Sequence, residues 1–271
     1  MISVDSEPVS ARILPMTDPL TRFSNRSDNY AKYRPGYPAG IIEILESRCG
    51  LEETSVVADI GSGTGMLSEL FLKEGNPVFA IEPNAAMRRT AEGLLKKFGK
   101  FRSVDATAEA TTLENESVDF VAAAQAFHWF DRDKAQREFA RILKPEGWVV
   151  LIWNERRLDS TAFLRAYEDL LLRYGTDYEK VRHENVTGEI GAFFAPETFV
   201  MQTLENAQYF NFESLKGRLL SSSYAPDHDQ PNFTAMLREL EEIFNANQED
   251  GIVSFEYDTK LYYGHLSRSG L

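Results

Sequence analysis

Three glycines stand at every second position of Gly61–Gly65, directly after a short apolar run and directly before an amphipathic segment. Glycine lets a backbone turn sharply and come close to a ligand. A buried strand, a glycine loop and a helix in this order typify a nucleotide-cofactor site at the carboxyl edge of a parallel sheet, because the helix presents its N-terminus to the ligand. The candidate cofactor-binding residues are Asp59, Gly61, Ser62, Gly63 and Gly65.

The spacing of these glycines distinguishes between kinds of cofactor site. A dinucleotide fingerprint requires G-x-G-x-x-G, in which the third glycine permits close packing of the helix on the strand. Met66 occupies the place of that third glycine, and no G-K-[ST] follows, so a Walker phosphate loop is absent. A glycine-rich turn without any ligand stays open as an alternative, and the positions further along the chain have to decide.

Polar residues follow three further apolar runs, as expected where strands end at a common edge of a sheet. Glu82-Pro83 follows 78–81, Asp105-Ala106 follows 101–104, and Gln125 follows 118–124. A carboxylate at the end of the second strand is placed to accept hydrogen bonds from two ribose hydroxyls, and such bonds are strong because the acceptor is charged. A dinucleotide site requires the same acid. The presence of Glu82 by itself therefore does not distinguish between the two kinds of cofactor site.

The loop and two other segments resemble a known family. Residues 59–65, Asp-Ile-Gly-Ser-Gly-Thr-Gly, are similar to motif I, D-[IL]-G-x-G-x-G, of the class I S-adenosylmethionine-dependent methyltransferases. Tyr30–Pro38 and Ala126–Asp131 resemble segments of small-molecule methyltransferases of the trans-aconitate and quinone-biosynthesis type. The resemblance covers residues 21–266 and implies S-adenosylmethionine as the cofactor, its methionine tail and ribose lying over the Gly61–Gly65 backbone.

The same resemblance assigns roles to other residues. In the family, an Asp followed by a small residue, here Asp105-Ala106, meets the adenine amino group, and Gln125 lies beside the methionine amino end. Arg34 would pair with the methionine carboxylate, a charge-assisted contact. Tyr30 and Tyr33 would close the site near the sulfonium, where an aromatic face favours a cation. Hydrophobic packing of the segment is the alternative for the two tyrosines.

His128 and Trp129 follow the fourth apolar run and are expected on the substrate side. His128 is the candidate catalytic residue, a general base, since an imidazole titrates near neutral pH. The alternative is a structural role, in which His128 only orients the substrate or bonds to the backbone. No metal site is predicted, because the single cysteine, Cys49, excludes a cysteine cluster.

Strand-like and helix-like segments alternate five times over residues 54–153, which implies a parallel sheet with right-handed crossovers. Residues 251–266 alternate apolar and polar side chains and predict a final antiparallel strand. With the resemblance, we expect a Rossmann-like α/β fold, with a mostly parallel seven-stranded sheet and helices on both faces. Helices are expected over residues 38–48, 65–74, 84–98, 132–143, 158–174, 214–220 and 233–245.

The composition along the chain predicts one domain with several parts. Residues 1–20 are rich in Ser, Pro and Asp and are expected to be poorly ordered, and 21–271 to be a single methyltransferase domain. Its predicted parts are a lid and first helix (21–53), a cofactor-binding core (54–153), a cap and substrate region inserted after the fifth strand (154–250) and the final strand (251–266). Residues 179–190 are polar and less regular than the neighbouring segments.

The chain has 271 residues, of which 43% are hydrophobic, and a formal net charge of −13. Nucleic-acid binding needs clustered Lys and Arg. The densest basic pairs, Arg88-Arg89 and Arg156-Arg157, are expected on solvated faces, so no nucleic-acid partner is predicted. The absence of a signal-like N-terminus and of a long apolar run predicts a cytoplasmic protein without a membrane span. We expect a monomer or a homodimer that acts on a small molecule.

These features together predict the transfer of a methyl group from S-adenosylmethionine to an oxygen or carbon of a small-molecule acceptor. The N/D-P-P-Y motif that is used for amino groups of bases and glutamine is replaced by Ala124-Gln125-Ala126-Phe127, and the several cysteines used in arsenic methylation are absent. The alternatives are a catalytically silent S-adenosylmethionine-binding protein and an NAD(P)-dependent oxidoreductase. The loop spacing and Asp105-Ala106 oppose the oxidoreductase.

Overall fold

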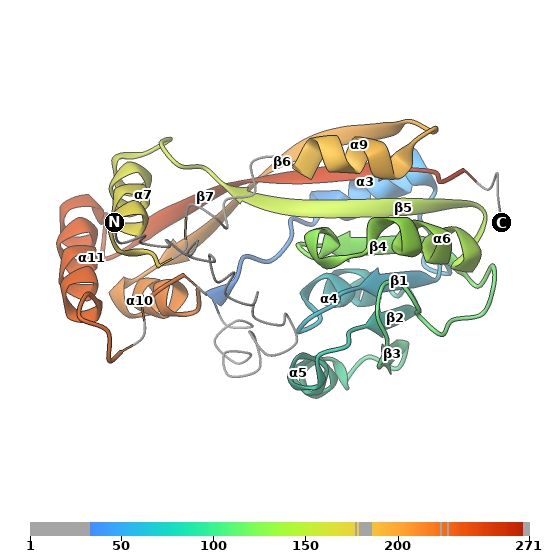
Figure 1. Cartoon of the computed structure of the whole chain (residues 1–271), viewed down its shortest axis with the longest axis horizontal. Coiled ribbons are helices and arrows are strands. Elements are labelled where there is room, and N and C mark those ends of the chain that lie inside the picture. The colour runs from blue at the N-terminus through green and yellow to red at the C-terminus, as the bar shows by residue number, and fades with distance from the viewer. Residues whose placement is uncertain (1–32, 177, 179–185, 223, 227, 268–271) are drawn as a thin grey trace, which may run out of the picture.

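Seven strands form one sheet in the order β3-β2-β1-β4-β5-β7-β6 in the computed structural model (Figure 1). The structure describes residues 33–176, 178, 186–222, 224–226 and 228–267. The strands are β1 (Val57–Ile60), β2 (Val78–Ile81), β3 (Phe101–Val104), β4 (Val118–Ala124), β5 (Leu143–Arg156), β6 (Phe199–Phe210) and β7 (Val253–Gly264). The first five are parallel, and β7 runs antiparallel between β5 and β6. The predicted mostly parallel sheet with a final antiparallel strand is confirmed.

Helices cover both faces of the sheet (Figure 1). They are α3 (Gly40–Cys49), α4 (Met66–Lys73), α5 (Ala85–Leu95), α6 (Arg132–Ile142), α7 (Ala162–Tyr174), α9 (Val186–Phe194), α10 (Phe212–Leu220) and α11 (Phe233–Asn247), with a single 3-10 turn among the described residues, η1 (Phe127–Trp129). All seven helices predicted from the sequence are present, with bounds that differ by a few residues. A further helix, α9, falls partly within the polar, less regular stretch.

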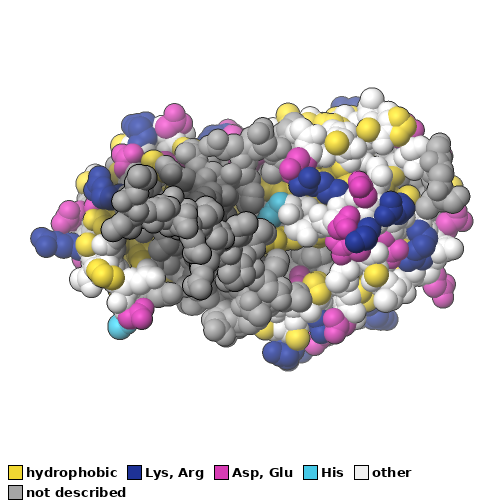
Figure 2. All heavy atoms as spheres, in the orientation of Figure 1, with side chains coloured by type: hydrophobic (Ala, Val, Ile, Leu, Met, Phe, Trp, Pro, Cys, Tyr) yellow, Lys and Arg dark blue, Asp and Glu magenta, His cyan; other side chains and the backbone are white. Residues whose placement is uncertain are grey.

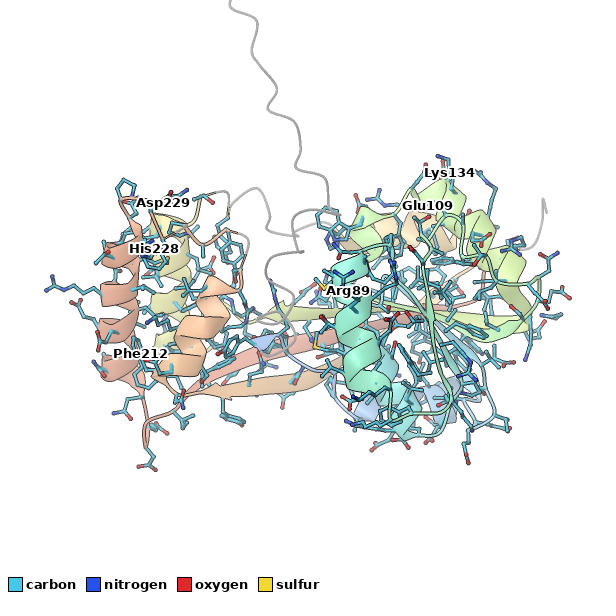
Figure 3. The ribbon with its side chains drawn as sticks, turned by 90° about the horizontal axis from the view of Figure 1, so that it is seen from below. Arg89, Glu109, Lys134, Phe212, His228 and Asp229 are labelled. Atoms are coloured by element: carbon cyan, nitrogen blue, oxygen red, sulfur yellow. The ribbon has the colours of Figure 1, made fainter. Side chains whose placement is uncertain are left out.

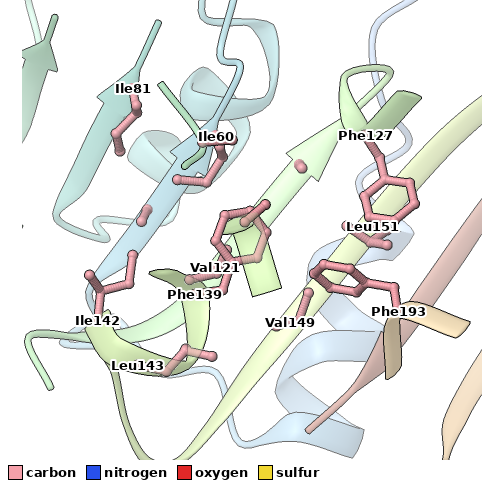
Figure 4. Close-up of a cluster of buried hydrophobic side chains, with 14 of the residues drawn as sticks. Ile60, Ile81, Val121, Phe127, Phe139, Ile142, Leu143, Val149, Leu151 and Phe193 are labelled. Carbon is pink, nitrogen blue, oxygen red and sulfur yellow. The ribbon is translucent and has the colours of Figure 1, made fainter. Parts of the chain in front are cut away.

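Two apolar layers sandwich the core of the sheet. All four residues of β1 are buried, which is the pattern of a parallel strand covered on both faces. One layer joins the sheet to α3, α4 and Leu95 of α5. The other joins it to α6 and α9, and here Phe127 packs edge-on against Phe193 with ring centroids 4.9 Å apart (Figure 4). The parallel strands are therefore held rigidly, with their carboxyl ends free to carry a site.

The three long strands β5, β6 and β7 continue beyond the core and carry a second group of helices (Figures 1 and 3). Helices α7, α10 and α11 pack on alternate residues of β7, Val253, Phe255 and Tyr257, in a separate apolar cluster. We call these helices and the strand ends that they cover the cap. Helix α7 follows β5, whereas α10 and α11 follow β6, so the cap is built from two stretches of chain separated by an edge strand of the sheet.

Charged side chains of both signs are interspersed over the described part of the face drawn in Figure 2. No helix within the described residues combines the length and the apolar character that crossing a membrane requires. Cys49 is buried at the end of α3.

Candidate cofactor site

The glycine loop, Gly61–Gly65, lies against the end of the neighbouring strand β2. The backbone N–H groups of Gly61 and Ser62 both donate to the carbonyl oxygen of Ile81, at 2.8 and 3.1 Å. The N–H of Gly65 closes the loop on the carbonyl of Ser62 at 2.9 Å. Helix α4 then begins at Met66 without a side-chain cap, because its N-cap residue is Gly65. The chain thus turns at the edge of the sheet where a ligand would lie.

Each glycine of the loop has a positive φ, but the surroundings of the three differ. A Cβ on Gly61 (φ 68°) would lie 2.6 Å from Cβ of Ala126, and one on Gly65 (φ 84°) would lie 2.5 Å from Leu95. These two glycines permit close packing against the segment after β4 and against α5. A Cβ on Gly63 (φ 57°) would meet nothing within 4 Å. The open side of the loop, where a cofactor has room, is therefore at Gly63.

Glu82, at the end of β2, joins the two strand ends of the predicted site. Its carboxylate accepts hydrogen bonds from the N–H of Gly63 at 2.9 Å and from the N–H of Asn84 at 2.8 Å. Burial raises the pKa of this carboxyl, and the two N–H groups and Arg88 oppose that rise. The carboxylate lies beside the open side of the loop, and each of its oxygens has capacity for a further donor.

The hydrogen bonds of the loop bear directly on the kind of cofactor. The N–H groups of Gly61, Ser62, Gly63 and Gly65 all have protein acceptors. A phosphate cradle instead turns such groups toward the ligand. The loop therefore suits a cofactor that presents ribose hydroxyls and apolar surface rather than a pyrophosphate, which agrees with the resemblance and opposes the dinucleotide alternative.

Arg88 is a positioning residue that the sequence analysis placed wrongly. Its side chain is 14% exposed, and one nitrogen donates to the carbonyl of Glu82 at 2.8 Å. Another forms an ion pair with Asp105 at 2.6 Å. Arg88 thereby links the ends of β2 and β3 and orients the predicted adenine-binding Asp105, whereas Arg89 is exposed, as expected.

Two further predicted cofactor residues lie next to these strand ends. Pro83 lies between Glu82 and the start of α5, and Ala106 is buried in the core.

Asp59 lies beneath the loop rather than on its open side. The side chain is fully buried, and one carboxylate oxygen accepts a hydrogen bond from the hydroxyl of Ser68 in α4 at 2.6 Å. The other oxygen and the buried hydroxyl of Thr64 have no hydrogen-bond partner within the described structure. Burial raises the pKa of Asp59 to about 7. Asp59 ties β1 to α4, and its predicted contact with a cofactor stays a prediction.

The substitution Asp59→Asn is expected to stabilise the protein increasingly as the pH rises. The folded protein binds the Asp59 proton more tightly than the unfolded chain does. Between about pH 4 and pH 7 the unfolded chain has lost this proton while the folded protein still holds it, so the free energy of unfolding falls as the pH rises. Asparagine stays neutral, so the variant does not undergo this loss. At high pH its free energy of unfolding should exceed that of the wild type by up to roughly 4 kcal/mol. Urea unfolding at pH 5 and pH 8 measures the effect, with Asp133→Asn at an exposed position as the control. An equal difference between variant and wild type at both pH values would contradict the buried, raised carboxyl.

The described part of the predicted lid is fastened to the sheet through its backbone. The amides of Asn154 and Asn206 both donate to the carbonyl of Gly36, at 3.1 and 2.9 Å. Gln208 donates to the carbonyl of Tyr33 at 3.4 Å. A Cβ on Gly217 of α10 would lie 2.3 Å from the Tyr33 ring, so this ring packs directly on the cap. The lid therefore bridges the core and the cap.

The other predicted residues are placed as follows. Tyr30 lies outside the described residues. Arg34 is half-buried in the lid. Gln125 adopts a positive φ of 54° after β4 and donates its amide to the carbonyl of Asn154 at 3.0 Å. The His128 ring lies in η1, 4.6 Å from the ring of Trp129, which is 40% exposed. Gln125 and the asparagine thus connect the cofactor edge to the lid, a link that the sequence analysis missed.

Comparisons with known proteins agree with this geometry. Residues 58–151 match a family model described as a methyltransferase domain. An uncharacterized methyltransferase-like protein of Schizosaccharomyces pombe is 33% identical over 159 residues, 58% of this chain and 60% of that protein. An uncharacterized methyltransferase of Mycobacterium tuberculosis is 30% identical over 205 residues, 74% of this chain and 76% of that protein. The chain thus spans less than two thirds of the Schizosaccharomyces pombe relative.

The fold is also found among solved structures. One from Anaeromyxobacter dehalogenans, reported as a type II methyltransferase, has a TM-score of 0.68 at 23% identity and covers 86% of this chain and 98% of that one. The sheet order, the glycine loop and the acid at the end of β2 define a Rossmann-like cofactor-binding protein. The chain belongs to the class I S-adenosylmethionine-dependent methyltransferases.

Proposed function

We propose that this chain, acting as one methyltransferase domain over residues 21–271, transfers a methyl group from S-adenosylmethionine to a small-molecule acceptor. Family membership supports the cofactor, and one observation of the structure carries the assignment. The Glu82 carboxylate stands beside the open side of Gly63, while the N–H groups of Gly61, Ser62, Gly63 and Gly65 are bonded to protein acceptors. Such a site offers a charged acceptor to ribose hydroxyls and offers no cradle to a phosphate.

The residues of the chain would hold the cofactor along the strand ends. Gly61, Ser62, Gly63 and Gly65 would support the methionine tail and ribose, Glu82 would bind the ribose hydroxyls, and Asp105-Ala106 would meet the adenine. The lid, with Tyr33 and Arg34, would cover the methionine end. The cofactor supplies a methyl group on a cationic sulfur, which leaves as a neutral thioether. The tasks of the protein are then to align the acceptor and to exclude water.

The acceptor atom is proposed to be an oxygen or a carbon. The segment after β4 carries Gln125-Ala126-Phe127 in place of the N/D-P-P-Y motif of enzymes that methylate amino groups of bases and glutamine. His128 and Trp129 follow directly in η1 and are proposed to face the acceptor. A carboxylate acceptor needs no base, whereas a phenol or an enolisable carbon needs one, and His128 is the proposed base for such acceptors.

Titration calorimetry with S-adenosylhomocysteine tests the cofactor assignment. We expect saturable binding of this product at one site, and no binding of NADH, because the N–H groups of the loop glycines are already bonded to protein acceptors. Binding of NADH alone would overturn the assignment of the glycine loop. A protein that binds S-adenosylhomocysteine is then incubated with methyl-labelled S-adenosylmethionine and a protein-free extract of small metabolites. Labelled product supports transfer, and its absence favours the catalytically silent alternative.

A further inference from the structure

The cap contains a buried arginine that lacks a carboxylate partner among the described residues. Arg218 of α10 is 6% exposed, and its guanidinium donates to the hydroxyl of Ser222 at 3.0 Å and lies beside the hydroxyl of Tyr257. Among the described residues, its Nε–H has no hydrogen-bond partner, and no Asp or Glu forms an ion pair with it. Burying a charge without a counter-charge is costly, and buried charges are generally paired.

A second buried arginine faces the same interior. Arg156, at the end of β5, forms an ion pair with Glu168 of α7 and donates to the hydroxyl of Tyr178 at 2.9 Å. Its Nη1 has no partner in the described part of the chain, and its guanidinium lies 5.2 Å from the centre of the Tyr167 ring. The hydroxyl of Tyr167 is also buried without a partner there. The sequence analysis placed Arg156 on a solvated face, and its side chain is in fact 11% exposed.

The charges of this arginine–tyrosine cluster, Arg156, Arg218, Tyr167 and Tyr224, do not balance within the described structure. Arg156 and Arg218 contribute two positive charges, and Glu168 contributes one negative charge. Burial alone would raise the pKa of Tyr224, but Arg218 and then Arg34 of the lid hold it below its ordinary value. A phenol whose ionised form is favoured reports a positive local potential. Among the described residues, the cluster is therefore short of negative charge.

The cluster is connected to the cofactor edge through β5. Gln125 donates to the carbonyl of Asn154, and Arg156 follows Asn154 by two residues on the same strand. Residues two apart point to the same face and are about 7 Å apart. On that face Asn154 also holds the lid at Gly36. A small molecule next to the lid could therefore reach both the cofactor edge and the cluster.

We propose that Arg218, Arg156 and Tyr167 bind an anionic oxygen group, a carboxylate or a phosphate, of the methyl acceptor. These three groups, which have no hydrogen-bond partner among the described residues, each offer an N–H or an O–H, and an anionic oxygen accepts such donors while it supplies a negative charge. This assignment to the acceptor rests on the proposed methyl transfer, whereas the anion site itself can be tested by binding alone.

Thermal unfolding of the full chain at constant ionic strength tests the site. Succinate and citrate represent carboxylates, inorganic phosphate and glycerol 3-phosphate represent phosphates, and sodium chloride is the reference. We expect one of the two classes at about ten times its Kd to raise the melting temperature by at least about 2 °C. Arg218→Met is expected to abolish this rise while its Kd for S-adenosylhomocysteine stays within about twofold of wild type.

Arg157→Met is the matched control. Arg157 follows Arg156 directly, but its side chain pairs with Asp258 and Glu205 on the other face of the strand, so the variant should keep the full anion effect. If Arg218→Met does not fold, Arg218→Lys is used instead, because lysine keeps the charge but lacks the forked donor geometry of arginine. This variant should reduce the anion-induced rise in melting temperature at least by half.

The outcomes separate the two proposals. No anion effect in the wild type, or an equal effect in the Arg218 variants, overturns the anion site, even if S-adenosylhomocysteine binds. An anion effect that Arg218→Met abolishes supports the site. If S-adenosylhomocysteine does not bind to such a protein, the proposed function fails, and with it the assignment of the anion to a methyl acceptor.

Discussion

The substitution Gly63→Ala is expected to weaken binding of S-adenosylhomocysteine at least tenfold while leaving the protein folded. A Cβ at this position meets nothing within 4 Å among the described residues, so the methyl group enters open space beside the Glu82 carboxylate. That space is where we place the ribose and methionine tail. Alanine at a φ of 57° costs roughly 1–2 kcal/mol of stability, because a side chain disfavours the left-handed region. Calorimetric titration gives the Kd, and thermal unfolding confirms the fold.

Gly50→Ala is the matched control for this substitution. Gly50 follows α3 with a φ of 68°, and a Cβ there also meets nothing within 4 Å. The two variants should therefore lose similar stability, and only Gly63→Ala should lose cofactor affinity. If both variants bind S-adenosylhomocysteine as the wild type does, the open side of Gly63 is not the cofactor site.

The cofactor edge could be predicted because local sequence determines it. Gly61, Gly63 and Gly65 adopt positive φ values that other residues disfavour, so the backbone geometry of the loop follows from residue type. The apolar runs before Glu82 and Asp105 end at strand ends, and parallel strands bring those ends to one edge. Each of these features depends on residues that are near one another in the chain.

The buried charges of the cap could not be predicted, because their partners are distant in sequence. Arg156 and Arg218 are 62 residues apart in the sequence, and the fold brings both within electrostatic range of Tyr167 and Tyr224. An arginine in a sequence reads as exposed unless its environment is known. The same holds for Arg88 of α5, whose ion pair with Asp105 reaches the end of β3, and for Asn206, which reaches the lid at Gly36.

Helix α9 could not be predicted from the sequence for a different reason. Among its described side chains, the buried apolar residues Ile190, Phe193 and Phe194, which pack on α6 and the sheet, lie in its second half. The residues before it are polar, so the helical period is too short to recognise. Tertiary packing against the core defines this helix more than its own sequence does.

The substitution Glu82→Gln is expected to raise the Kd for S-adenosylhomocysteine by roughly 10- to 100-fold. Hydrogen bonds to a charged group contribute about 1.5–3 kcal/mol, which corresponds to a change of this size. The carboxylate accepts from the N–H groups of Gly63 and Asn84. In glutamine, one of the two acceptors becomes an NH₂ group that faces a donor, so the loop loses a bond and the ribose loses a charged acceptor. Glu92→Gln, exposed on α5, is the control and should bind normally.

The pH dependence of binding distinguishes a carboxylate that contacts the ligand from one that only supports the loop. Because burial raises the pKa of Glu82, protonation in mildly acidic solution should weaken binding of S-adenosylhomocysteine to a protein that carries Glu82. The Glu82→Gln variant has no such proton to gain, and its Kd should not change with this titration. The nearby Asp59 also titrates, so both proteins are compared in the Asp59→Asn background. A Kd for Glu82→Gln within about threefold of wild type, with the same pH profile, would assign Glu82 to loop structure alone, because a charged ribose acceptor cannot be removed without a loss of affinity.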